Sequence, residues 1–166
     1  MPSKPESLVL AEMVDSTRQL TRFYISKLKG QDMFHVFEMD GKKFNSPYWI
    51  IAHLTWAQNN LILRATGGTN PEIKWLSKFK LGSTIPPKEE LPDLLEVLAG
   101  FKKVHQMSLD HIRSLDESKL DEPNVLGINL FEDSSIRGMI HHQIRHEGTH
   151  IGHLGWLAKM YGIHTF

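Results

Sequence analysis

The chain has 166 residues, the length of one domain, and its 19 lysines and arginines balance 19 aspartates and glutamates. This neutral charge excludes the basic field of a nucleic-acid-binding protein, and the absence of cysteine excludes disulfides and thiolate ligands. There is neither a signal-peptide core nor an apolar run near the roughly 18 residues of a membrane span. We therefore expect residues 1–166 to form a single cytoplasmic domain with no nucleic-acid or membrane partner.

The first predicted helix runs from about Pro5 to Leu28, and Gly30 ends it. Apolar residues recur in it every three or four positions, as on the core-facing side of a helix. Beyond it, residues 33–39 form a strand or a turn of helix, and Asp40-Gly41 is a turn signal. The positions that we expect to face the core are Leu10, Met13, Val14, Leu20, Tyr24 and Leu28.

The second predicted helix opens at Ser46-Pro47, an N-cap followed by proline at the first helical position. It continues to Ile62 and stops at Gly67-Gly68. A long crossover with three prolines, Thr69 to Lys88, follows. The third helix is expected from about Glu89 to Leu115, with Pro92 in its first turn, where a missing N–H is tolerated.

The last predicted helix begins at the capping residues Asp133-Ser134-Ser135 and ends at Gly162. An irregular stretch, Asp116 to Glu132, separates it from the third helix. Four amphipathic helices joined by two long connections predict an all-α protein, a four-helix bundle with a long crossover between helices 2 and 3.

The stretch from His146 to His153, His-Glu-Gly-Thr-His-Ile-Gly-His, is the most informative part of the sequence. Residues four apart on a helix have Cβ atoms about 5–6 Å apart, so His146 and His150 can direct two imidazoles at one ion. Both lie on the apolar seam of the last helix, where a buried polar group without a partner costs about 1–3 kcal/mol. A bound metal is the commonest reason to gather neutral imidazoles in a core.

His53 shares a stripe with Ile50 and Ala57 on the second helix, so it also points inward. Three imidazoles from two helices leave coordination positions open for water or substrate. We therefore predict a divalent-metal site made of His53, His146 and His150. Nitrogen ligands suit Zn²⁺, Ni²⁺, Co²⁺ or Fe²⁺ and do not choose among them.

Further residues are candidates for roles around the ion. Asn60 and Arg64 continue the stripe of His53, and an inward arginine must either pair with a carboxylate or hold an anionic cosubstrate. Glu147 and His153 are the candidate catalytic groups for proton transfer. Glu147 either bonds the outer nitrogen of a ligand or faces solvent, and His153 is a pocket wall, a group behind the ligands or a structural residue. We expect His105 to be hydrogen-bonded in the core, and Trp49, Trp56 and Trp156 to be core residues.

His-Glu-x-x-His is also the pattern of zinc metallopeptidases, in which the glutamate is the general base. Those enzymes usually take a third ligand downstream of the second histidine, yet none of the 16 residues after His150 is acidic. The chain also has little room for the sheet that forms a peptidase cleft. A metallopeptidase is therefore the less favoured interpretation.

Three segments together resemble the DinB-like (DinB/YfiT) superfamily. They are Ser46-Pro47-Tyr48-Trp49-Ile50-Ile51-Ala52-His53-Leu54-Thr55-Trp56, Pro86-Pro87-Lys88-Glu89-Glu90-Leu91 and His146-Glu147-Gly148-Thr149-His150-Ile151-Gly152-His153-Leu154. The resemblance covers nearly the whole chain, in order. His153 is a departure, since many members carry glutamine there.

The resemblance implies the same bundle, with a divalent metal, Zn or Ni before Fe or Co, held by His53, His146 and His150. Better-understood relatives are metal-dependent transferases or isomerases that use a low-molecular-weight thiol. Because this chain lacks cysteine, the nucleophile would be a thiol cosubstrate, and the second substrate would be an electrophile. The resemblance also implies a homodimer. The alternative is a non-catalytic bundle in which the metal ties helix 2 to helix 4.

Overall fold

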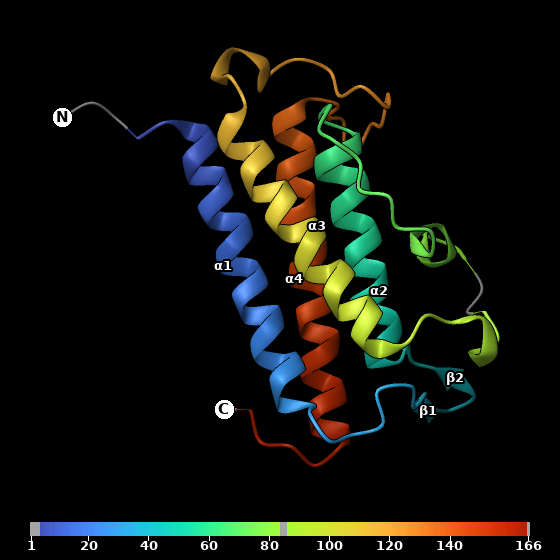
Figure 1. Cartoon of the computed structure of the whole chain (residues 1–166). Coiled ribbons are helices and arrows are strands. Elements are labelled where there is room, and N and C mark those ends of the chain that lie inside the picture. The colour runs from blue at the N-terminus through green and yellow to red at the C-terminus, as the bar shows by residue number, and fades with distance from the viewer. Residues whose placement is uncertain (1–3, 84–85, 166) are drawn as a thin grey trace.

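Four long helices run side by side along one axis, as the computed structural model shows (Figure 1). The structure describes residues 4–83 and 86–165, so residues 1–3 and 166 of the predicted domain and residues 84–85 of the predicted crossover lie outside the described residues. Within the described ranges, no helix combines the length and apolarity needed to cross a membrane. The predicted all-α bundle is confirmed, with helices α1 (Glu6–Lys27), α2 (Pro47–Gln58), α3 (Leu94–Ser114) and α4 (Ile136–Met160).

The long crossover between α2 and α3 is the connection that shapes the bundle. It returns the chain from the end of α2 to the opposite end of the molecule, so that α2 and α3 run in the same direction (Figure 1). Two short 3₁₀ helices, Leu76–Phe79 and Lys88–Glu90, interrupt it. The first is anchored by Phe79, which is fully buried and packs edge-on against Tyr48 of α2. The crossover therefore lies against α2 and supports it.

Side-chain caps fix the starts of α2 and α4 where the sequence predicts them. The Ser46 hydroxyl accepts from Trp49 N at 3.2 Å, and the Ser135 hydroxyl accepts from Gly138 N at 2.9 Å. The start predicted for α3 is wrong, because the helix begins at Leu94 and not near Glu89. Proline disfavours helical geometry in the residue before it, and Asp93, in extended conformation, caps the helix by accepting from Glu96 N at 2.8 Å.

A small antiparallel hairpin of β1 (Glu38–Met39) and β2 (Lys42–Lys43) precedes α2. The predicted turn at Asp40-Gly41 closes it, with φ of 51° and 71° at these two residues. Positive φ at both central positions matches a two-residue turn that follows the twist of the strands. The hairpin lies beside the start of α2 (Figure 1).

The core face of α1 is only partly the one expected, since Leu10, Val14 and Leu28 are buried as predicted but two other residues are not. Met13 and Leu20 are 46 % and 43 % exposed, whereas Arg18 and Thr21 are fully buried. The apolar spacing alone did not show that a charged residue occupies the buried face. Arg18 contacts Glu147, the residue that follows the candidate ligand His146.

Candidate metal centre

Three imidazoles from two helices meet inside the bundle. One ring nitrogen from each of His53, His146 and His150 lies within 4.8 Å of the other two. The Nε2 atoms of His53 and His146 are 3.2 Å apart. His53 and His150 are 2 % and 8 % exposed, and His146 is half-buried. The structure thus brings the three predicted ligands together at a point where they can hold one ion.

The orientation of His53 is set by its surroundings. Its Nδ1 lies 2.8 Å from the carbonyl oxygen of Phe79, which can only accept, so Nδ1 carries the proton and Nε2 keeps its lone pair. The ring is stacked on Trp49, with centroids 4.6 Å apart and planes 10° apart, and on Trp56, with centroids 5.6 Å apart. The Nε2 lone pair therefore faces His146, and the long crossover supplies the bond that aims it.

Burial keeps all three rings neutral near pH 7. It lowers the pKa of His53, and burial together with His53 lowers the pKa of His146 to about 4. Burial and the neighbouring His146 lower the pKa of His150 to about 3. Neutral imidazole is the form that binds metal ions, and His146 Nδ1 is buried without a hydrogen-bond partner. The donor set and its protonation state therefore fit a divalent ion with open coordination positions.

His153 lies one turn after His150 and is exposed. Its Nδ1 is 3.3 Å from the Nδ1 of His150, so the two rings are adjacent. The structure thus places a solvent-accessible imidazole next to a candidate ligand. A catalytic role for His153 stays a prediction.

Glu147 faces away from the three imidazoles and into the core between α1 and α4. Its carboxylate accepts from Arg18 Nη2 at 3.0 Å, from the Thr21 hydroxyl at 2.6 Å and from the Gln143 amide at 3.1 Å. Arg18 Nε is a further 2.7 Å contact, and both charged side chains are almost completely buried. This geometry argues against proton transfer by Glu147, and equally against its use as the general base of a peptidase.

Arg18 is the centre of a buried polar network that the sequence reading missed. Its Nη2 also donates to Gln58 at 2.7 Å, and the guanidinium carbon lies 3.7 Å from the centre of the Phe101 ring. The Gln58 amide lies 3.2 Å from His105 Nδ1, and His105 Nε2 donates to Asp15 at 2.9 Å. The hydrogen-bonded core role expected for His105 is thus observed, and the network joins all four helices. The sequence offered one signal of this burial, because Leu10, Val14 and Arg18 follow one another at steps of four residues and so lie on one face of the helix.

Asn60 and Arg64 are separated from the predicted cluster by a change of helix type. Residues Asn59–Arg64 form a π-helical segment at the end of α2, so the α-helical spacing from His53 no longer applies. Arg64 is exposed and donates to Asn60 Oδ1 at 3.2 Å. The geometry thus gives no support to a cosubstrate site at these two residues.

Comparison with known proteins gives one family. A family model described as the DinB superfamily matches residues 13–154, a range that contains all three candidate ligands. No curated protein matches the chain.

Proposed function

The chain belongs to the DinB superfamily, and we propose from this premise that it is a divalent-metal-dependent transferase using a low-molecular-weight thiol cosubstrate. The observation that carries the proposal is the convergence of three neutral imidazoles within 4.8 Å. Three neutral imidazoles whose nitrogens face one another favour a bound metal over an inert core, and the buried Nδ1 of His146 has no hydrogen-bond partner, which is destabilising.

We assign His53, His146 and His150 as the metal ligands and Zn²⁺ or Ni²⁺ as the first candidates, with Fe²⁺ or Co²⁺ next. When bound, such an ion would supply Lewis acidity, which favours the deprotonated form of a thiol. The Phe79 carbonyl holds the His53 ring in place, and Trp49 and Trp56 keep water from its two faces. These residues fix the ligand geometry before any substrate arrives.

The protein contains no cysteine, so the sulfur nucleophile in this proposal comes from the cosubstrate. The sulfur–carbon bond forms as the thiol gives up its proton and the electrophile gives up a leaving group or a π bond. We assign the proton to His153, which is exposed and adjacent to His150. The proton then moves from His153 to the leaving group, or to the atom that takes up the π electrons.

We further propose that the protein is a cytoplasmic homodimer. Family membership supports the dimer, and so do three apolar side chains of α1 that are partly exposed, Val9, Met13 and Leu20. Light scattering after gel filtration measures the mass directly. A monomer at micromolar concentration would contradict this part of the proposal.

The function is tested with protein purified without chelators. Elemental analysis should find about one divalent ion per chain, and metal-dependent turnover is expected with one of bacillithiol, mycothiol or glutathione and a panel of electrophiles. His150→Ala should lose both metal and turnover, whereas His164→Ala, a change at an exposed histidine, should keep both.

Two outcomes separate the alternatives. Bound metal and a chelator-sensitive melting temperature without turnover with any thiol would favour the non-catalytic bundle. Absence of metal from protein purified in this way would contradict both metal-dependent proposals.

A further inference from the structure

We infer that the apolar cavity beside His153 binds the organic body of the electrophile, and that this body is an aromatic or branched-alkyl group without positive charge. The role as electrophile site rests on the proposed function. The ligand class rests on the cavity itself.

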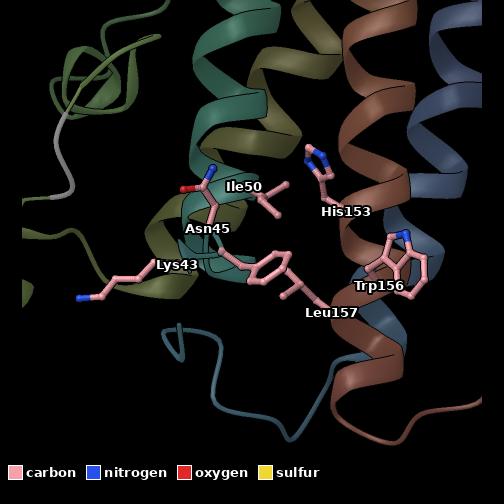
Figure 2. A pocket seen from close by; sticks show the side chains of 7 residues that line it. Lys43, Asn45, Ile50, His153, Trp156 and Leu157 are labelled. Carbon is pink, nitrogen blue, oxygen red and sulfur yellow. The ribbon is translucent and has the colours of Figure 1, made fainter. Parts of the chain in front are cut away.

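The cavity lies between the start of α2 and the C-terminal half of α4 and measures about 240 Å³. Its walls are mainly apolar, formed by Phe44, Ile50, Trp156 and Leu157. Figure 2 shows Ile50, Leu157 and Trp156 around one space, with the ring of His153 at one end of it. An aromatic or branched-alkyl group matches such a lining, because moving apolar surface from water into an apolar cavity is favourable.

The cavity adjoins the metal centre through His153, which lines it. Ile50 precedes His53 by one turn of α2, and His153 follows His150 by one turn of α4. The His153 ring that ends the cavity has its Nδ1 3.3 Å from His150 Nδ1. A molecule in the cavity therefore has one end against His153, the residue that separates the cavity from His150.

A second cavity extends the site outwards. It measures about 430 Å³, shares Phe44 and Trp156 with the first, and reaches Met39 and Met160. Ligand pockets commonly measure about 300–1,000 Å³, so the two together have room for more than a single ring. Trp156 is 63 % exposed at their junction, contrary to its expected place in the core. A ligand along this groove would cover it.

The charges around the two cavities select the ligand further. Among the described residues that line them there is no aspartate or glutamate, and the only lysines are Lys43 and Lys159. Figure 2 shows the Lys43 ammonium group pointing away from the space, towards the outside. An ammonium ligand would thus lose its hydration without gaining a counter-charge, whereas a carboxylate at the outer end can meet Lys159, whose Nζ lies 5.1 Å from the centre of the Trp156 ring.

The opposite flank of the histidine cluster is the rival location. There Phe131 is 83 % exposed, and its ring lies 6.0 Å from that of His142, which in turn lies 6.1 Å from that of His146. Neither Phe131 nor His142 lines either of the two cavities, so Phe131 offers a matched exposed aromatic residue for comparison with Trp156.

Three probes with one apolar body test the inference: 4-phenylbutan-1-ol, 4-phenylbutyrate and 4-phenylbutylamine. Their affinities for the full chain as purified are measured by isothermal titration and ligand-observed NMR. The alcohol and the acid should bind, and the amine should bind at least about tenfold more weakly, a difference of about 1.4 kcal/mol. Trp156→Ala should weaken binding of the alcohol about tenfold, while Phe131→Ala leaves it unchanged.

The inference is overturned if Trp156→Ala binds the alcohol as tightly as the wild type, or if the amine binds as well as the acid. Because none of the probes reacts, binding does not depend on turnover. A Trp156-dependent affinity in a protein without metal or turnover would leave the cavity assignment standing and remove the proposed function. Thiol-dependent turnover without that affinity would do the reverse.

Discussion

Replacing Glu147 by glutamine removes the charge opposite Arg18 while preserving side-chain size. Arg18 and Glu147 are 0 % and 1 % exposed, so the remaining guanidinium would be buried without a counter-charge. Breaking a buried ion pair by removing one partner costs about 3–5 kcal/mol. We therefore expect Glu147→Gln to lower the free energy of unfolding by about that amount, a large part of the stability of a domain this size.

The assay is urea unfolding followed by circular dichroism, completed as a double-mutant cycle. Arg18→Met should cost a similar amount, because it leaves the carboxylate unpaired. The double variant, Arg18→Met with Glu147→Met, should be more stable than either single variant, since replacing both charges with apolar groups is often neutral. A cost below about 1 kcal/mol for Glu147→Gln, or additive costs in the double variant, would refute this account of the network.

Burial, and after it the charge of Arg18, lowers the pKa of His105 to about 4. Between about pH 4 and 6.5 the unfolded chain therefore binds a proton at His105 that the folded chain does not. The free energy of unfolding falls as the pH falls through this range. His105→Gln should reduce that slope of unfolding free energy against pH by up to about 1.4 kcal/mol per unit and leave the metal content unchanged; an unaltered slope would contradict it. A Cβ at Gly100 would lie 2.6 Å from Trp75 Cζ2, so Gly100→Ala should lower the free energy of unfolding in urea by about 1–3 kcal/mol. Gly152 has open space around it, so Gly152→Ala should raise that free energy by about 0.5–1 kcal/mol. Equal effects of the two substitutions would count against close packing of the crossover on α3. A chelator should lower the melting temperature of the wild type and not that of His150→Ala, and an equal shift in both would disprove metal bound by this residue.

Local signals in the sequence predicted much of the backbone. Ser46, Ser135 and the Asp40-Gly41 turn each act through their own neighbours, so their effects could be inferred without the fold. The start of α3 was misplaced because Asp93 is a stronger cap than the helical pattern before it suggested.

Some residues of the candidate site could be predicted from the sequence, and others could not. His53, His146 and His150 were identified because seam positions of two helices face each other in any such bundle. The Phe79 carbonyl could not be predicted, since it comes from a crossover whose path depends on tertiary packing. The π-helical segment that displaces Arg64 also has no clear mark in the sequence. Glu147 was assigned the wrong neighbours because its partner, Arg18, lies 129 residues away.

X-ray absorption spectroscopy of the metal-loaded protein tests most directly whether one ion is bound jointly by α2 and α4. It counts the imidazoles around the ion. We predict three in the wild type and two after His53→Ala. An ion with no imidazole ligands, or an unchanged count of three after that substitution, would contradict the assignment.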